Sequence, residues 1–309
     1  MTSATSQPAL VRTAHAGASV RARTALVLAG LGAGIALAML WSSALVDQTI
    51  GFGVADSVLG QDARHSAITT AGAGALFALV SGVAGTFTAC NIAVFSALPA
   101  VISPGAGRRA RLRATMGAIG CLSIGLLAVA AGYGFVAVLI GAWLPQVSTG
   151  TVAGLPVRLV QSMVVFGLIG LALLYLGLAT LGRLPDPFAS RPRSRLVTLG
   201  GLIAGFLVGR PYPLFHQLLT SAVASHNPWY GALALALQSL GNVLVIAVLA
   251  VLLALTGGGL ASRLLSPGRA ALIAGIVLVA LGTFLVCYWD VRLPAAFGYG
   301  VFPTMPWNR

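Results

Sequence analysis

The sequence predicts an all-α, polytopic membrane protein of about seven transmembrane helices. Only 7% of the 309 residues are charged, 58% are hydrophobic and the mean hydropathy is +0.97, whereas a soluble domain carries roughly 25% charged residues. Runs of about 20 apolar residues, the length that spans a bilayer, fill most of the chain. Nearly all of the charge lies between these runs, which are residues 25–46, 69–103, 114–143, 157–182, 196–224, 227–256 and 268–289.

The placement of the arginines predicts the orientation of the chain. All 18 basic residues are arginine; thirteen flank alternate spans on the N-terminal side, and four lie on the opposite side. Because arginine and lysine are retained in the cytoplasm during insertion, we expect a cytoplasmic N-terminus and an extracytoplasmic C-terminus in the cell (plasma) membrane. The net charge of +13 is therefore interpreted as a topology signal. The basic loops are expected to contact the headgroups of the lipid bilayer, not nucleic acid.

The first span follows a polar, arginine-bearing tail. Ser42-Ser43-Ala44 resembles a small-residue cleavage site, but the preceding leader is long for a signal peptide, so we expect an uncleaved helix. Cleavage would leave six spans with the same orientation. Residues 1–23 are then a cytoplasmic tail, and residues 24–68 are the first transmembrane helix with its extracytoplasmic loop.

The next six spans divide into two halves of three. An odd number of spans in each half inverts the second half relative to the first, as in the inverted repeats of transporters, whose sites lie near the bilayer midplane at broken helices. The expected segments are a first half at 69–182, a cytoplasmic linker at 183–195, a second half at 196–292 and an extracytoplasmic tail at 293–309.

The fifth span contains the clearest break signal, Arg210-Pro211-Tyr212-Pro213, about halfway along the segment. Two prolines remove two backbone donors and clash with preceding carbonyls, and a break within lipid is tolerated only where protein or water shields the freed groups. Before the break, a stripe that lets another helix approach closely is formed by Gly201, Gly205 and Gly209. The sequence therefore predicts a shielded helix break at residues 210–213.

Arg210 is the charged residue that the break places inside a span. Such a charge costs between ~3 and ~10 kcal/mol unless it is solvated or paired, although the C-terminal end of the preceding half-helix favours a cation. All five aspartates are expected in loops or at a span end: Asp47, Asp56, Asp62, Asp186 and Asp290. Arg210 therefore either caps carbonyls of the broken helix permanently or contacts water or an anionic or thiolate ligand.

Other polar residues within the spans are candidates for the same site. The full set of candidate substrate-binding residues is Arg210, Pro211, Tyr212, Pro213, His216, Gln238, Asn242, Thr88 and Asn91. The alternative for Gln238 and Asn242 is an interhelical hydrogen bond worth roughly 1 kcal/mol, and for His216 it is a structural histidine. The three cysteines, Cys90, Cys121 and Cys287, all fall in spans, which excludes a secreted type of disulfide framework; the alternative for each is a small buried hydrophobe.

Several of these residues fall in patterns shared with a known family. The patterns are Ser81-Gly82-Val83-Ala84-Gly85-Thr86-Phe87-Thr88-Ala89-Cys90 with Pro99, Ala204-Gly205 through Arg210-Pro211-Tyr212-Pro213, His226-Asn227-Pro228-Trp229-Tyr230-Gly231 and Gln238-Ser239-Leu240-Gly241-Asn242. Over about 69–292 the chain resembles the DsbD/CcdA family of transmembrane thiol-disulfide proteins, within the wider LysE-like transporter superfamily. Such proteins pass reducing equivalents across the membrane for cytochrome c maturation and extracytoplasmic thiol repair.

The resemblance implies that Cys90 is the catalytic, first redox cysteine. The second redox position falls at Arg210 to Pro213, where no cysteine is present, and Ala89 replaces the proline that precedes the first cysteine in the family. Because a dithiol relay needs two thiols, Cys90 would work with a partner's thiol or with another cysteine of the chain brought near by motion; otherwise the fold serves a different task. The resemblance implies an extracytoplasmic thioredoxin-like or cytochrome-maturation protein as that partner.

Three functions stay open at this point. The first is thiol or electron transfer of the CcdA type, and the second is small-solute or ion transport with a midplane site at the broken helix. The third is an accessory subunit of a membrane complex, for which the aromatic tail 297–307 would be a docking strap; its alternative is an interfacial anchor. The sequence carries no nucleotide, haem or zinc signature and no Ser-His-Asp set, so we expect no cofactor, no metal and no conventional hydrolytic enzyme.

Overall fold

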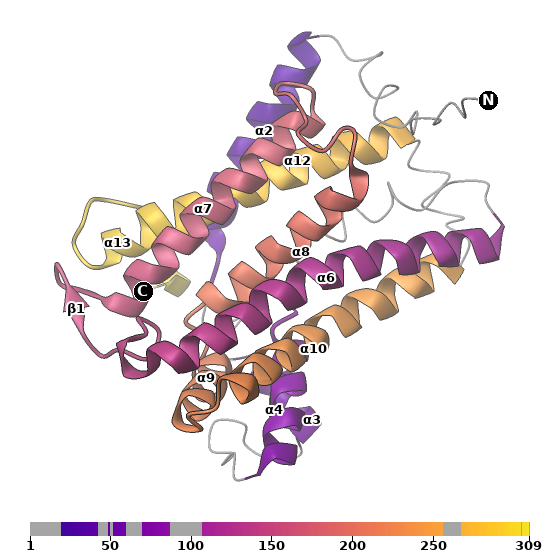
Figure 1. Cartoon of the computed structure of the whole chain (residues 1–309). Coiled ribbons are helices and arrows are strands. Elements are labelled where there is room, and N and C mark those ends of the chain that lie inside the picture. The colour runs from indigo at the N-terminus through magenta and orange to yellow at the C-terminus, as the bar shows by residue number, and fades with distance from the viewer. Residues whose placement is uncertain are drawn as a thin grey trace.

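The computed structural model describes residues 20–42, 49, 52–59, 70–86, 107–255, 267–303 and 305–308. This part of the chain is almost entirely helical (Figure 1), which confirms the predicted class. Within these described ranges, five helical segments are long and apolar enough to cross a bilayer: Val20–Leu40, Arg108–Trp143, Val157–Thr180, Pro228–Leu252 and Ala271–Ala296. The count of seven spans stays a prediction.

The predicted second and fifth spans contain none of these five segments; the helices Ala71–Ala84, Pro192–Gly209 and Pro213–Ala224 lie there. The α-helices are α2 (Val20–Leu40), α3 (Phe52–Leu59), α4 (Ala71–Ala84), α6 (Arg108–Ile140), α7 (Val157–Thr180), α8 (Pro192–Gly209), α9 (Pro213–Ala224), α10 (Pro228–Leu255), α12 (Pro267–Val286) and α13 (Leu293–Ala296). The shorter elements are the 3₁₀ turns η2 (Gly141–Trp143) and η4 (Pro306–Asn308), the π-helix η3 (Cys287–Arg292), and an antiparallel hairpin of β1 (Thr151–Val152) and β2 (Leu155–Pro156).

Proline begins four of the helices. Its fixed φ suits the first helical turn, where its missing N–H needs no partner. The four are Pro192, Pro213, Pro228 and Pro267. At the start of α10, Asn227 adds a side-chain cap, because its Oδ1 accepts from the backbone N–H groups of Trp229 (3.0 Å) and Tyr230 (3.3 Å). Helix boundaries in the second half are thus encoded locally.

The central pair of the bundle is α6 and α10, which lie side by side and antiparallel (Figure 1). Their backbones come into contact at two glycines: a Cβ on Gly134 would lie 2.2 Å from the Gly231 carbonyl oxygen, and one on Gly231 would lie 2.5 Å from that of Gly134. Such distances are impossible for a real side chain. Glycine therefore sets the separation of these helices, as small residues do between membrane helices.

The pair α7 and α12 is built in the same way. A Cβ on Gly170 would lie 2.9 Å from the carbonyl oxygen of Gly282, and a Cβ on Gly282 would lie 2.6 Å from that of Gly170. Two turns along, Gly177 and Gly275 repeat the contact, with a Cβ on Gly177 3.0 Å from the Gly275 carbonyl oxygen. The two helices therefore run antiparallel along a shared line of glycines.

Helix α4 packs on α10 through one glycine from each helix. A Cβ on Gly82 would lie 1.8 Å from the Gln238 carbonyl oxygen, and one on Gly241 would lie 2.2 Å from the Leu79 carbonyl oxygen. Each helix therefore uses two positions three residues apart, one with a glycine and one with a carbonyl. Neither glycine tolerates a side chain in this packing.

Helix α8 packs on α6 with the same arrangement of contacts. A Cβ on Gly200 would lie 1.9 Å from the Leu122 carbonyl oxygen, and one on Gly125 would lie 1.9 Å from the Val197 carbonyl oxygen. Again each helix contributes a glycine and a carbonyl three residues apart. The α4–α10 interface and the α6–α8 interface thus have matching local geometry in the two halves of the sequence.

The last long helix extends beyond the predicted end of its span at residue 289. After α12 the chain continues as the π-helix η3 and then α13, so the apolar segment runs to Ala296. The Leu293 N–H donates to the Tyr288 carbonyl, the wider spacing of a π-helix. Pro294 has no N–H to give to the Asp290 carbonyl, which is a local reason for the irregular turn. Asp290 therefore lies inside the segment, not at its end.

Arg292 ties this π-helix to the end of α2. The side chain is buried, with 9% exposure, and its Nη1 donates to the carbonyls of Ala38 (2.6 Å) and Trp41 (2.8 Å). Its guanidinium also lies over the Tyr288 ring, 5.1 Å from the centroid. A cation at the C-terminus of a helix satisfies free carbonyls and the helix dipole, so Arg292 fixes where α2 ends.

Candidate functional site

The predicted helix break is confirmed at the predicted residues. Helix α8 ends at Gly209, Arg210 and Tyr212 adopt extended backbone with φ of −80° and −87°, and α9 starts at Pro213. The Tyr212 N–H donates to the Arg210 carbonyl at 2.7 Å, and the His216 N–H donates to the Tyr212 carbonyl at 2.9 Å. The two prolines therefore interrupt the helix over three residues, and the chain restarts at once.

The carbonyl of Gly209, freed by the break, is satisfied by the first half of the chain. It accepts hydrogen bonds from Ser162 Oγ at 2.6 Å and from Gln146 Nε2 at 3.2 Å. Both donors are buried. This contact shows the protein shielding that a broken helix requires within lipid, and it assigns the capping of Gly209 to side chains other than that of Arg210.

The same contact corrects the expected depth of the break. Ser162 lies five residues after the start of α7 at Val157, which is about 7.5 Å along the helix axis. Gln146 lies beyond the end of α6 and its 3₁₀ turn. The break is therefore close to the end of the bundle where α7 begins, because the eighteen residues of α8 already cover about 27 Å. Along the sequence it lies about halfway through the segment, as predicted.

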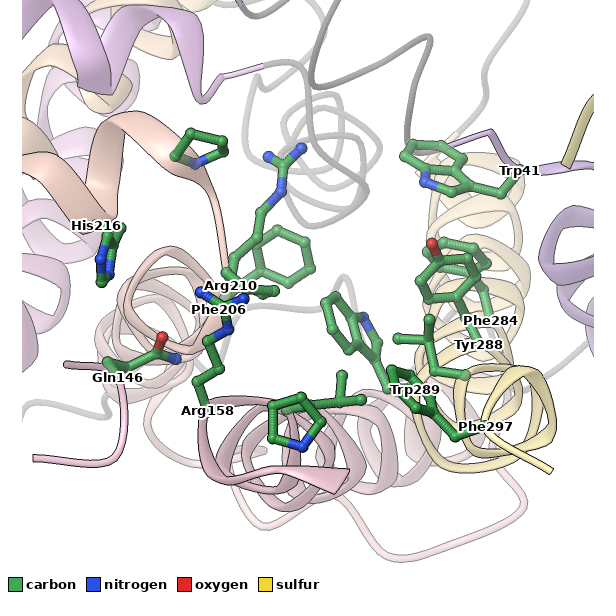
Figure 2. Close-up of a pocket in the computed structure, with 15 residues that line it drawn as sticks. Trp41, Gln146, Arg158, Phe206, Arg210, His216, Phe284, Tyr288, Trp289 and Phe297 are labelled. Atoms are coloured by element: carbon green, nitrogen blue, oxygen red, sulfur yellow. The ribbon is translucent and has the colours of Figure 1, made fainter. Parts of the chain in front are cut away.

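A cavity of about 520 Å³ opens beside the break, within the range of small-molecule sites. Figure 2 shows two chemically different sides. Polar side chains from the break, α7, α9 and the loop after α6 lie on one side together with the Phe206 ring, and the other side is formed by aromatic rings of Trp41, just after α2, and of α12 with its π-helix. The lining residues are Trp41, Gln146, Pro156, Arg158, Leu159, Phe206, Arg210, Pro211, Pro213, His216, Phe284, Tyr288, Trp289, Leu293 and Phe297.

Two arginines make this cavity cationic. Arg158, in the first turn of α7, is exposed, whereas Arg210 at the break is only 9% exposed. The Arg210 guanidinium lies 4.9 Å from the centroid of the Tyr212 ring, a cation–π contact that stabilises a desolvated cation. Positive charge therefore extends from the surface into the interior of the cavity.

Helix α3 brings an aspartate to the break, which corrects the expectation of a plain loop at residues 47–68. Phe52 and Ala55 are buried, and the Phe52 ring lies 6.2 Å from the Tyr212 ring. Asp56, one turn after Phe52, is half-buried and close enough to Tyr212 to act on it electrostatically. The apolar spacing of residues 52–59 folds this segment against the bundle, so the carboxylate is not in a free aqueous loop.

The other candidate residues separate into three groups. His216 lines the cavity together with Arg210, Pro211 and Pro213, while Tyr212 packs behind it. Gln238 and Asn242 do not line it; they are buried between α4 and α10, where Gln238 Nε2 donates to Ser81 Oγ at 3.1 Å, which favours the interhelical interpretation. Outside the described residues lie Cys90, Thr88 and Asn91.

Sequence reasoning missed much of the cavity wall. It used Arg158 only to assign topology and did not single out Gln146 or Ser162. The aromatic side is formed by residues near the ends of separate spans, among them Trp41 and Trp289. The Trp289 ring stacks on the Phe166 ring with a centroid distance of 4.2 Å. Tryptophan at span ends is a general interfacial signal. The sequence therefore indicated how deep these tryptophans lie in the bilayer, but not that they line the same cavity.

The C-terminal tail folds across the end of the bundle where the cavity lies. Phe297 lines the cavity, the Tyr299 hydroxyl donates to the Ala153 carbonyl in the hairpin, and Trp307 Nε1 donates to the Leu40 carbonyl at the end of α2. The aromatic residues of the tail therefore bind elements of their own chain that flank the cavity.

No protein-family model, curated protein or solved structure matches the chain. The resemblance to DsbD/CcdA proteins therefore stays a prediction.

Proposed function

We propose that the chain is a multi-pass transporter that binds a small organic anion in the cavity at the broken helix. The observation that carries this proposal is that two cations line the same cavity of about 520 Å³: Arg210, which is buried, and Arg158, which is exposed. An intramembrane cation is costly and marks a binding site or pathway by default. The opposing aromatic side accommodates an apolar body, so the preferred anion is amphipathic.

We further propose that the two halves form an inverted repeat of three spans each. Support comes from the α4–α10 and α6–α8 interfaces, which use the same pair of positions three residues apart on every helix. A two-fold relation that exchanges α4 with α8 and α6 with α10 accounts for both. The antiparallel packing of α6 on α10 and of α7 on α12 is compatible with that relation. Inverted repeats supply the two alternating conformations of many transporters.

The proposed membrane arrangement has seven spans, with the N-terminus in the cytoplasm and the C-terminus outside the plasma membrane. Support comes from the arginine distribution, thirteen against four. In this orientation the start of α7, Arg158 and the cavity mouth face the extracytoplasmic side. The cavity would then load from outside, through the region where the tail lies.

The test is binding of benzoate, a planar organic anion, to the purified protein in detergent. Benzoate at 100 times its dissociation constant is expected to stabilise the fold by about 2.7 kcal/mol, with a smaller effect for inorganic phosphate and none for choline. Arg210→Ala and Arg158→Ala should abolish the thermal shift, while Arg269→Ala, an exposed arginine at the start of α12, should retain it. Unchanged benzoate binding in both cavity variants would contradict the proposal.

Thiol transfer is the second candidate, and it is favoured by the sequence pattern that ends at Cys90. That residue lies outside the described part of the chain; Cys121 on α6 and Cys287 in the π-helix are both free thiols. The partner would be an extracytoplasmic thioredoxin-like or cytochrome-maturation protein. Cys90→Ser should then change extracytoplasmic thiol status and the yield of c-type cytochromes in cells, whereas the anion transporter would show neither effect.

A further inference from the structure

Asp290 is an acidic residue inside an apolar helical segment. It lies in the π-helix Cys287–Arg292, within the stretch Ala271–Ala296 that is apolar enough to span a bilayer. Its carboxyl group packs against Gly167, ten residues along α7 from Val157, or about 15 Å from that helix end. Asp290 therefore lies deeper in the bundle than the helix break does.

The packing around this carboxyl is specific. Within the described residues, Oδ2 of Asp290 is buried and has no hydrogen-bond partner. A Cβ on Gly167 would lie 3.0 Å from this oxygen, so glycine at this position provides the space that the carboxyl occupies. An ionised carboxyl with one oxygen buried and without a partner is disfavoured, whereas the neutral acid is compatible with this environment.

The open side of Asp290 faces the lipid-contacting surface. On α7, the neighbours Val164, Leu168 and Leu171 are all exposed apolar residues, and so is Val291 on the π-helix. In a membrane-spanning bundle, exposed aliphatic side chains of this kind contact acyl chains. The half-buried carboxyl of Asp290 thus lies where the π-helix packs on α7, at the edge of that surface.

The charged groups on the surrounding elements are directed elsewhere. Arg158 of α7 lines the cavity, and Arg292 binds the carbonyls of α2. The cations of α2 and α12 lie at the opposite ends of those helices, and α13 carries none. The remaining titratable neighbours are Cys287, Tyr288, which lies under Arg292, and Tyr175, which donates to the Pro185 carbonyl.

We propose that Asp290 is a proton-binding site that reaches the lipid face of the protein and carries its proton as a neutral carboxylic acid. The site backs directly onto the cavity: the adjacent Trp289 lines the cavity and stacks on Phe166, which adjoins Gly167. Release of the proton would place a charge immediately behind this wall. On the proposed transport function, which this last step requires, Asp290 supplies a proton that moves with the anion.

The proton site is tested by labelling with dicyclohexylcarbodiimide, which partitions into lipid. The carboxyl O–H adds across one C=N bond, so that oxygen bonds to the central carbon and the proton goes to nitrogen. The acyl group then migrates from oxygen to nitrogen and leaves a stable N-acylurea with no leaving group. Mass spectrometry of the reconstituted wild-type protein should find this adduct on Asp290, with labelling that decreases as pH rises because only the acid form reacts.

Controls separate this site from general reactivity. Asp290→Asn should lose the adduct, and Gly167→Ala should reduce it by crowding the carboxyl while leaving Asp290 in place. Asp186 is an internal control, because its carboxylate is paired with Arg195 at 3.5 Å. Absence of the adduct from folded wild-type protein, or equal labelling of Asp290 by a water-soluble carbodiimide, would overturn the proton site.

The coupling role has a separate readout. In proteoliposomes, Asp290→Asn should keep benzoate exchange but lose the accumulation of benzoate driven by a pH gradient. Retained accumulation in this variant would refute coupling. If the wild-type protein takes up no benzoate at all, the proposed transport function and the coupling role both fail, while the labelling result still decides the proton site.

Discussion

The carbonyl of Gly209 depends on two side chains for its hydrogen bonds. Ser162→Ala removes the donor at 2.6 Å and leaves only Gln146 at 3.2 Å, so we expect a loss of about 1 kcal/mol in the free energy of unfolding. Gln146→Ala should cost a similar amount. The double variant should lose more than the sum of the two, because the buried carbonyl is then without a partner. Unfolding by a denaturing detergent measures each value.

A sum that is simply additive would mean that water reaches Gly209 and replaces the missing donors. Ser162 also donates to the Arg158 carbonyl at 2.9 Å, so Thr at this position, which keeps the hydroxyl, is the matched control and should retain most of the stability. A Ser162→Thr variant as unstable as Ser162→Ala would show that packing, not the hydroxyl, is responsible.

At the scale of single residues, the sequence identified the break but not its partners. Arg210-Pro211-Tyr212-Pro213 could be recognised because proline acts on its own backbone. Gln146 and Ser162 could not, because their role depends on which distant segments meet. Asp290 was expected at a span end for a similar reason: the π-helix that continues α12 arises where Pro294 follows an apolar helix, and hydropathy does not detect it.

At the scale of helices, glycine contacts fix the distance between α6 and α10. Gly134→Ala would place a Cβ 2.2 Å from the Gly231 carbonyl oxygen, so the helices must separate, and we expect a loss of about 2 kcal/mol or more. Gly132, on the same helix, has nothing within 4 Å of a Cβ. Gly132→Ala should be neutral or stabilising by about 0.5–1 kcal/mol through helix propensity. Thermal unfolding in one detergent compares the pair.

Equal effects of Gly132→Ala and Gly134→Ala would contradict the close packing of α6 on α10. The sequence predicted close approach along the stripe Gly201, Gly205 and Gly209, but the backbone contact of α8 is at Gly200, outside that stripe. A Cβ on the three stripe glycines would instead meet side chains, those of Val129 at 3.4 Å, Ile169 at 3.2 Å and Val165 at 2.7 Å. The number of glycines could not show which of them contact a neighbouring helix, because 39 are present and several have nothing within 4 Å of a Cβ. Which glycine faces a neighbouring backbone follows from the rotation of each helix in the bundle.

At the scale of the whole molecule, the two halves pack with matching contacts although their sequences share little. The matched positions, Leu79 and Gly82 in one half and Val197 and Gly200 in the other, combine a glycine with a residue that contributes only its backbone carbonyl. A backbone contact requires glycine at one of the two positions and leaves the side chain at the other position free to vary. The structural repeat can therefore persist while the residue types diverge. The sequence therefore predicted the three-plus-three division from span count, but it could not supply the register between halves.

The orientation of the whole molecule decides which side loads the cavity, and cysteine labelling tests it. In a variant whose three native cysteines are replaced by alanine, Val301→Cys places a thiol in the tail, where Val301 is 95% exposed. Ser190→Cys places one in the exposed linker between α7 and α8. A membrane-impermeant maleimide added to intact cells should label Cys at 301 and should label Cys at 190 only after permeabilisation. The reverse pattern would place the thirteen-arginine side outside, and the cavity would then load from the cytoplasm.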